Sequence, residues 1–224
     1  HLNKRLEGMP LQYITGTQEF MGLDFMVNQD VLIPRPDTEI LVENVLKAVD
    51  LTHPSGISIF DIGCGSGAIG VSLAYYASKV DVSCVDISCA ALKAAKQNAV
   101  THNVHHKMHF FEGDIFAPIK HQKFDMIVSN PPYIPDESID SLQIEVSKYE
   151  PRSALAGGKD GLDFYRRIVK DAPHYLKNNG LIFLEIGYDQ AAAVKDLLKS
   201  ESVYDGIEVI KDLAGHDRVV KARG

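Results

Sequence analysis

Ile57-Ser58-Ile59-Phe60-Asp61-Ile62-Gly63-Cys64-Gly65-Ser66-Gly67 is the stretch of sequence that decides the fold. Its first six residues predict a buried strand, and a helix is expected directly after it, at 68–77. Glycines between a strand and a helix allow a tight turn and let the backbone approach a ligand closely. The stretch therefore predicts a strand, a ligand-binding loop and a helix, in that order.

Strands and helices alternate from this stretch to about residue 200. Strands are expected at 57–62, 80–85, 108–111, 124–128, 181–186, 206–211 and 218–222, and helices at 68–77, 90–101, 162–176 and 190–198. Asn178-Asn179-Gly180 is interpreted as the end of the helix over 162–176. The last two strands are joined so closely that they must run antiparallel. The pattern predicts an α/β fold with an open, doubly wound, mostly parallel seven-stranded sheet and an antiparallel C-terminal edge strand.

A smaller unit precedes this sheet. Residues 1–18 are expected to form a surface connector, because Gly8, Pro10 and Gly16 interrupt any helical pattern. A small hairpin or two-strand meander is expected over 20–33, with a turn at glycine 22.

Pro34-Arg35-Pro36-Asp37 is expected to stop the last of these strands and to start a helix, which Asp37 or Thr38 can cap. A loop is expected at 52–56. We accordingly divide the chain into a connector with a β-hairpin at 1–36 and a domain at 37–224 that contains the sheet.

Asp61, just before the glycine loop, helps to distinguish between the possible ligands of the loop. Gly63-x-Gly65-x-x-Ala68 formally matches the dinucleotide-binding fingerprint, which alone is a weak signal. Asp61 lies two residues before the first glycine, where its carboxylate repels a pyrophosphate. The same carboxylate attracts a cation such as the ammonium or sulfonium group of S-adenosylmethionine.

Two further carboxylates follow successive strands. Asp86 ends the second strand, where it can accept hydrogen bonds from both hydroxyls of a ribose. Asp114 follows the third strand and can accept from the adenine amine, while Ile115 can lie against the ring face. Each of these residues alone is more often a cap or a core residue, but the ordered set favours a cofactor site. The thiol of Cys64 is expected to fill the loop rather than to act as a nucleophile.

The turn Asn130-Pro131-Pro132-Tyr133 directly follows the strand at 124–128 and Ser129. Two prolines fix the backbone and remove two N–H donors, so carbonyl oxygens nearby are free to accept. An amide oxygen, free carbonyls and an aromatic ring together suit a planar substrate that carries an –NH2 group. The alternative is an ordinary proline turn after a strand.

Composition limits the class of protein. The net charge is −7 and Lys and Arg occur in no run longer than a pair, which argues against a dedicated nucleic-acid binder. No apolar run approaches the roughly 18 residues of a membrane span, and the N-terminus has no signal-peptide pattern. Cys64, Cys84 and Cys89 lack the spacing of metal ligands and fit a reducing compartment. We therefore expect a cytoplasmic protein with no metal, no membrane contact and no direct nucleic-acid partner.

These motifs together resemble the Rossmann-like methyltransferases that use S-adenosylmethionine to methylate amino groups. Asn-Pro-Pro-Tyr is shared by enzymes that act on adenine N6, guanine N2 or glutamine N5, so the upstream sequence has to choose. Pro10–Gly16, Glu19–Gly22 and Val31–Glu39 are similar to the release-factor glutamine N5-methyltransferase family, as are Glu150–Leu155 and Gly157-Gly158-x-x-Gly161. Members of that family usually carry an N-terminal helical domain, which this chain starts too late to hold.

The resemblance implies an enzyme that methylates the side-chain amide of the glutamine in the Gly-Gly-Gln loop of class I peptide chain release factors. The donor would be S-adenosyl-L-methionine and the product S-adenosyl-L-homocysteine. The expected cofactor-binding residues are Asp61, Gly63, Cys64, Gly65, Ser66, Gly67, Asp86, Asp114, Ile115 and Asn130. The expected substrate-binding residues are Asn130, Pro131, Pro132 and Tyr133, of which Asn130, Pro131 and Tyr133 are also expected to be catalytic. Tyr133 is expected to wall the pocket, and the segment 32–36 to close its other side.

Three alternatives remain at this point. A nucleic-acid base methyltransferase acting on adenine N6 or guanine N2 would use the same turn, but the sequence has no target-recognition insert and no basic groove. A regulatory module that binds the cofactor without turnover, or a dehydrogenase that binds a nicotinamide, would not need the intact Asn-Pro-Pro-Tyr turn.

Overall fold

The computed structural model describes residues 1–52 and 56–224, so most of the loop expected at 52–56 lies outside the described residues. The strands are β1 (Thr17–Phe20), β2 (Leu23–Met26), β3 (Ile57–Ile62), β4 (Val80–Asp86), β5 (Met108–Glu112), β6 (Phe124–Ser129), β7 (Leu176–Glu185), β8 (Asp205–Lys211) and β9 (Asp217–Arg223). The α-helices are α1 (Leu2–Leu6), α2 (Leu11–Thr15), α3 (Glu39–Thr52), α4 (Ala68–Tyr76), α5 (Cys89–Thr101), α6 (Ile144–Ser147), α7 (Asp163–Asp171) and α8 (Ala191–Ser200). The 3-10 helices are η1 (Pro36–Thr38), η2 (His105–Lys107), η3 (Asp136–Ser141), η4 (Arg152–Ala154) and η5 (Ala172–His174).

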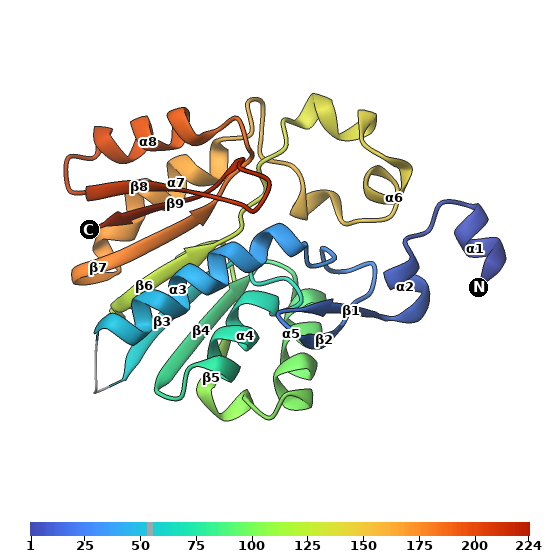
Figure 1. Cartoon of the computed structure of the whole chain (residues 1–224), viewed down its shortest axis with the longest axis horizontal. Coiled ribbons are helices and arrows are strands. Elements are labelled where there is room, and N and C mark those ends of the chain that lie inside the picture. Colours follow the sequence, from blue (N-terminus) through green and yellow to red (C-terminus); the bar gives the residue numbers. More distant parts are fainter. Residues whose placement is uncertain (53–55) are drawn as a thin grey trace.

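A seven-stranded sheet in the order β5-β4-β3-β6-β7-β9-β8 forms the centre of the molecule (Figure 1). The five strands from β5 to β7 are parallel, and β9 runs antiparallel to both of its neighbours, β7 and β8. The last strand of the chain therefore inserts beside β7, and β8 forms the edge through antiparallel pairing. This arrangement confirms the doubly wound, mostly parallel sheet with an antiparallel edge.

The strand order reverses between β3 and β6, which pair in parallel. The register sets Ile62 opposite Ser129, so the glycine loop after β3 and the proline turn after β6 begin side by side. Open α/β sheets bind their ligands at such a switch point, outside the carboxyl ends of the strands. The fold thus brings together two motifs that are more than 60 residues apart in the sequence.

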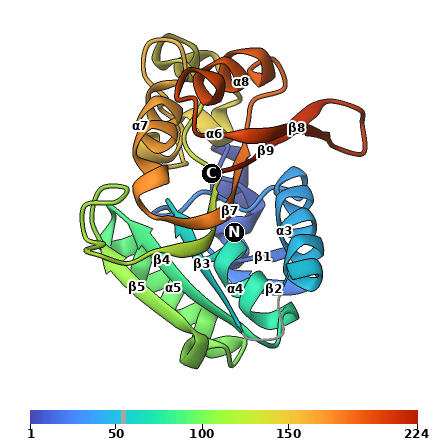
Figure 2. The same cartoon turned by 90° about the vertical axis from the view of Figure 1, so that its left-hand side faces the viewer.

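Alternate residues of the central strands build two separate hydrophobic cores, because successive side chains of a strand point to opposite faces. On β3, Ile59 belongs to the core shared with α3, α4 and α5, whereas Phe60 belongs to the core shared with α7 and α8. Figure 2 shows α3 and α7 on opposite sides of the sheet. Both faces of the sheet are covered, which explains why its strands are almost continuously apolar.

The two-stranded sheet confirms the N-terminal hairpin. Strands β1 and β2 pair antiparallel, and their turn consists of Met21 and Gly22, both with positive φ. The strand that was expected to reach residue 33 and stop at Pro34 does not form at 31–33. Val31 is buried against Ala91 of α5 instead, so its hydrophobicity reflects packing on a helix and not pairing in a sheet.

The prediction that residues 1–18 contain no helix is wrong. Two short helices, α1 and α2, fit between Gly8, Pro10 and Gly16, which lie just outside their ends. Gly16 ends α2 in the left-handed conformation, and its N–H donates to the carbonyl of Gln12 at 2.7 Å. The glycines and the proline therefore bound the helices rather than exclude them.

The start of α3 also differs from expectation. Residues 36–38 form the 3-10 turn η1, and no side chain caps this turn. Asp37 instead forms an ion pair with Arg218, and Thr38 accepts a hydrogen bond from Asn130. Both side chains are recruited by distant partners, and the sequence around the helix start cannot reveal such partners.

The helix expected at 162–176 ends five residues early, at Asp171. Pro173 lies in the next turn, η5, and a proline has no N–H with which to continue a helix. Asn178-Asn179-Gly180 lies inside β7, not at a helix end. There the pairing with β6 jumps from Leu176 to Leu181, and Asn179 has a φ of +62°. These residues form a bulge in a strand.

Within the described ranges, 1–52 and 56–224, no helix combines the length and the apolar character needed to cross a lipid bilayer.

Candidate active site

A cavity of about 340 Å³ lies at the carboxyl edge of the sheet, in the size range of roughly 300–1,000 Å³ typical of small-molecule sites. Of the residues expected at the site, Gly63, Gly65, Asp86, Asp114, Ile115, Asn130, Pro131 and Pro132 line the cavity. Asp61, Cys64, Ser66, Gly67 and Tyr133 lie outside its lining. The ends of four neighbouring strands, β3, β4, β5 and β6, thus contribute to one cavity.

The glycine loop leaves room for a ligand against its backbone. Gly63 and Gly65 have φ values of +70° and +54°, in the left-handed region that favours glycine. A Cβ built on either residue would meet no protein atom within 4 Å. A side chain there would therefore occupy open space at the cavity, whereas Gly67 packs closely on Ala95 of α5. The loop provides the bare surface that a bound cofactor requires.

Asp86 presents its carboxylate at the cavity in a fixed orientation. One carboxylate oxygen accepts from the N–H of Gly65 at 2.8 Å, and the other accepts from the N–H of Ser88 at 2.9 Å. Burial raises the pKa of this carboxyl, and these backbone hydrogen bonds oppose the rise. Each carboxylate oxygen can accept more than one hydrogen bond, so Asp86 retains acceptor capacity for two hydroxyl groups of a ligand.

Asp61 is fully buried beneath the loop, and only one of its oxygens has a partner. Its Oδ2 accepts from the N–H of Gly70 at 3.1 Å, while Oδ1 has no hydrogen-bond partner. Burial and, to a lesser extent, the charge of Asp86 raise the pKa of Asp61 to about 7, although the hydrogen bond from Gly70 opposes the rise. A buried carboxylate without a full set of partners is costly, and a nearby positive charge would stabilise it. This observation fits a cationic cofactor better than a pyrophosphate.

The raised pKa of Asp61 predicts a pH-dependent stability. As pH rises from about 4, the unfolded chain releases this proton first, while the folded protein keeps it until about pH 7. The group therefore lowers the free energy of unfolding across that window, by a few kcal/mol at most, since a tenfold change in proton affinity corresponds to about 1.4 kcal/mol. Asp61→Asn should remove this contribution. Denaturant unfolding at pH 4, 5.5, 7 and 8 measures the free energy of unfolding of both proteins. The value for the variant should rise relative to that of the parent up to pH 7. Parallel pH profiles of the two would contradict the prediction.

The end of the cavity beside Asp114 contains two residues that the sequence did not indicate. Arg167 on α7 forms an ion pair with Asp114 at 2.5 Å, and both residues line the cavity. The ring of Phe164, one turn earlier on α7, also lines it and lies 5.9 Å from the Arg167 guanidinium. Ile115 has a φ of +51°, which is uncommon for a β-branched residue and typical of a turn held for function.

Asn130 is held by its amino group. Its Nδ2 donates to the hydroxyl of Thr38 at 3.1 Å, which leaves the amide oxygen as an acceptor. The strand before it is fixed because the hydroxyl of Ser129 donates to the carbonyl of Ile62 at 2.8 Å. The ring of Tyr133 packs on the core beside α7 and α8, and burial raises its pKa to about 12. The aromatic ring thus supports the turn from behind rather than facing the cavity.

Two segments close the cavity from outside the sheet. One contains residues 30–32 and the other Pro151, Ser153 and Ala154. They are joined by an ion pair of 2.6 Å between Arg35 and Glu150, whose carboxylate is buried. The expectation that the segment 32–36 lies at the site is consistent with Leu32, which lines the cavity.

Comparisons with known proteins agree with this geometry. The family model "Methyltransferase small domain" matches residues 36–145. The release factor glutamine methyltransferase of Clostridium acetobutylicum is 48% identical over 99% of this chain and 78% of its own length. That of Geobacter sulfurreducens is 46% identical over 98% of this chain and 75% of its own length.

Solved structures share the fold at lower sequence identity. A methyltransferase from Pyrococcus furiosus has a TM-score of 0.66 at 18% identity, with 100% of this chain and 98% of that chain covered. A ribosomal protein L11 methylase from Lactobacillus delbrueckii has a TM-score of 0.61 at 18% identity, with 84% and 79% covered. The chain is therefore a methyltransferase, and it belongs to the release factor glutamine methyltransferase family.

Proposed function

We propose that this protein transfers a methyl group from S-adenosylmethionine to the side-chain nitrogen N5 of the glutamine in the Gly-Gly-Gln motif of class I peptide chain release factors. The single observation that carries the proposal is Asn130, whose amide oxygen remains free at the edge of a cavity while its amino group is bonded to Thr38. We assign the catalytic domain to residues 37–224 and the cytoplasm as its compartment.

The cavity suits S-adenosylmethionine, which when bound supplies a methyl group on a positively charged sulfur. Gly63 and Gly65 would take its amino-acid part, with the Asp61 carboxylate beneath. Asp86 would accept from the ribose hydroxyls and Asp114 from the adenine amine. The names of the relatives and the open surface over the glycine loop support this assignment.

Asn130 and Pro131 would hold the substrate. A glutamine amide has two N–H groups, and the Asn130 Oδ1 and the Pro131 carbonyl would each accept from one of them. The two prolines make the turn stiff, so these acceptors keep their places when the substrate arrives. This holds the substrate nitrogen in line with the methyl group that it receives.

No side chain has to remove a proton before transfer. The amide nitrogen is a poor nucleophile because its lone pair is delocalised, so the gain comes from positioning and from oriented dipoles. The proton leaves the nitrogen during or after methyl transfer. Bound S-adenosylmethionine would supply the methyl group, and its sulfur would keep the electron pair of the broken carbon–sulfur bond, which gives S-adenosylhomocysteine.

The same acceptors give specificity. A glutamate side chain brings only acceptors when it is ionised, and it would leave Asn130 and Pro131 without donors. Sites that hydrogen-bond a particular group reject analogues that lack it, by factors on the order of 10⁴. The net charge of −7 and the names of the relatives favour a protein substrate over a nucleic-acid base.

The test is incubation of the protein with methyl-labelled S-adenosylmethionine and a purified class I release factor, followed by mass-spectrometric mapping of the label. The expected result is a gain of one methyl group on the glutamine of the Gly-Gly-Gln motif. A release factor in which that glutamine is replaced by alanine serves as the control. Label on another residue, or on both proteins equally, would contradict the proposal.

Asp86→Ala should weaken cofactor binding. The variant loses the acceptor for the two ribose hydroxyls. A hydrogen bond to a charged group is worth about 1.5–3 kcal/mol, so loss of even one such bond should raise the dissociation constant about 10–150-fold. Asp81 lies on the same strand with its side chain exposed outside the cavity, which makes Asp81→Ala a matched control. Calorimetric titration with S-adenosylhomocysteine measures both. Equal affinity in the two variants would remove Asp86 from the cofactor site.

A further inference from the structure

The residue that holds the Asn130 amide is itself buried and away from solvent. Thr38 is only 5% exposed, and its hydroxyl oxygen accepts from Asn130 Nδ2 at 3.1 Å. A threonine hydroxyl can donate as well as accept. If the hydroxyl proton of Thr38 is donated to another group, the hydroxyl oxygen can only accept, and it then binds the amino end of the Asn130 carboxamide.

Glu185, at the end of β7, is the group that can accept the hydroxyl proton of Thr38. It is 1% exposed, and its Oε2 has no hydrogen-bond partner. Burial raises the pKa of this carboxyl to about 7, while hydrogen bonding by Thr38 and Asn130 and the charge of Arg218 oppose the rise. Ser129 pairs with Leu184, so Glu185 lies at the next position along β7, beside Asn130. When ionised, a carboxylate only accepts, so Glu185 favours the arrangement in which the hydroxyl proton of Thr38 points to it and the hydroxyl oxygen accepts from Asn130.

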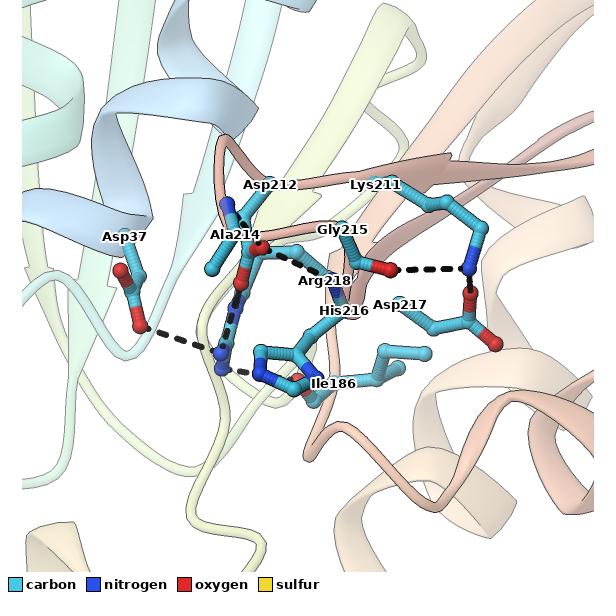
Figure 3. A network of polar contacts seen from close by, with 9 residues as sticks. All are labelled: Asp37, Ile186, Lys211, Asp212, Ala214, Gly215, His216, Asp217 and Arg218. Atoms are coloured by element: carbon cyan, nitrogen blue, oxygen red, sulfur yellow. Dashed lines mark hydrogen bonds and ion pairs between the residues drawn. The ribbon is translucent and has the colours of Figure 1, made fainter.

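Arg218 contacts the residue before Thr38 and the residue after Glu185, as Figure 3 shows. Its guanidinium lies 3.0 Å from an oxygen of Asp37 and 3.1 Å from an oxygen of Asp212, and it donates to the carbonyl of Ile186 at 3.4 Å. Asp37 precedes Thr38 in the chain, and Ile186 follows Glu185. Arg218 of β9 therefore links η1, which precedes α3, to the residue that follows β7.

We propose, on the basis of the proposed function, that Thr38 and Glu185 are positioning residues that keep the amide oxygen of Asn130 turned towards the substrate. They touch neither substrate nor cofactor; neither lines the cavity. The hydroxyl oxygen of Thr38 accepts from the amino end of the carboxamide, so the oxygen end is the one left for the glutamine N–H. The assignment extends the site to residues 92 and 55 positions away from Asn130 in the sequence.

Loss of the Thr38 hydroxyl should therefore change what Asn130 presents. Without the hydroxyl that accepts from its amino group, the carboxamide loses the contact that fixes its orientation. It can then turn over and direct N–H groups at the N–H groups of the substrate. Catalysis then falls, and the preference for a glutamine over a glutamate at the target position falls with it. A purely structural role of Thr38 would lower stability without moving this preference.

The experiment compares Thr38→Val, which keeps the shape and removes the hydroxyl, with Thr38→Ser, which keeps the hydroxyl. Each is assayed for methyl transfer to a release factor, for inhibition by the same release factor carrying glutamate in place of the glutamine, and for binding of S-adenosylhomocysteine. Thr38→Val should lose about 10-fold or more in kcat, as expected for one hydrogen bond to a charged or oriented group. It should also bind the glutamate form more tightly than the parent does, with cofactor affinity unchanged. Thr38→Ser should resemble the parent in its inhibition by the glutamate form.

Two outcomes would overturn the inference. The first is a Thr38→Val variant that matches Thr38→Ser in kcat and in inhibition by the glutamate form. If Thr38→Val does not fold, Glu185→Gln is tested instead. The second contradicting outcome is a Glu185→Gln variant whose kcat and whose inhibition by the glutamate form equal those of the parent. A parent enzyme that fails to methylate the release factor would instead overturn the proposed function, and with it the inference that rests on it.

Discussion

Replacing Asn130 with alanine is expected to lower kcat on the order of 10²-fold, the usual loss when one oriented polar group is removed from a reacting centre. The reason is geometric. Asn130 contributes an acceptor at the edge of the cavity, and its orientation is fixed because its amino group donates to Thr38 at 3.1 Å. Steady-state methyl transfer to the release factor measures this loss.

Cofactor binding separates this effect from a general loss of structure. Asn130→Ala should retain the parent's affinity for S-adenosylhomocysteine to within about threefold, because the glycine loop and Asp86 remain intact; a threefold change is about 0.65 kcal/mol. Asn3→Ala, an exposed position on α1, is the control for asparagine removal. Near-normal turnover of Asn130→Ala with intact cofactor binding would refute the role of Asn130.

Gly161→Ala should damage both stability and activity. Gly161 has a φ of +76°, and a Cβ there would lie 2.2 Å from the carbonyl oxygen of Tyr133 and 2.8 Å from Nε2 of Gln190. The left-handed conformation costs an alanine about 1–2 kcal/mol. Overpacking adds about 1–3 kcal/mol. The backbone that has to move is the proline turn itself, and a displacement of about 1 Å at a reacting centre can cost on the order of 10²-fold in rate.

Gly16→Ala is the matched control for this prediction. Gly16 has nearly the same conformation, with a φ of +82°, but a Cβ there would meet nothing within 4 Å. It therefore carries the backbone strain without the contact, and its kcat should stay near that of the parent. Thermal unfolding and methyl transfer measured on both variants test the idea. Equal loss of activity in the two would show that the contact between Gly161 and the turn has no role.

The contact also explains why two separate blocks of sequence belong to one site. A Cβ on Gly157 would lie 2.8 Å from the carbonyl oxygen of Pro132 and 2.8 Å from the Cα of Tyr133. Gly157 and Gly161 thus pack closely on the backbone of the proline turn, where a side chain would not fit. The spacing of Gly157 and Gly161 reflects this close approach.

Local sequence patterns predicted the sheet because its strands are short apolar runs separated by helices with one apolar stripe. Ile57–Ile62 and Phe124–Ser129 form strands within one residue of expectation. The start of β7 was misread because Asn178-Asn179-Gly180 has the composition of a helix end, and only pairing with β6 makes it a bulge. Competition between local and tertiary interactions decided each such case.

Some residues of the candidate site could be predicted from the sequence and others could not. Residues that follow strand ends, such as Asp86, Asp114 and Asn130, could be placed at one edge from topology alone, because parallel strands end together. Thr38 and Arg167 could not, because each reaches the site across a distance that no local pattern encodes. Thr38 has the ordinary sequence pattern of a helix cap, and its contact with Asn130 arises only when α3 packs against β7 and β9.

The most direct test of the central claim is a structure of the protein with S-adenosylhomocysteine and a peptide that contains the Gly-Gly-Gln motif. The glutamine nitrogen should lie about 2.9 Å from the Asn130 amide oxygen, a normal hydrogen-bond distance. It should also face the sulfur of the product, which should lie over Gly63 and Gly65. A complex in which the glutamine binds away from Asn130, or in which the sulfur lies on the far side of the turn, would contradict the account.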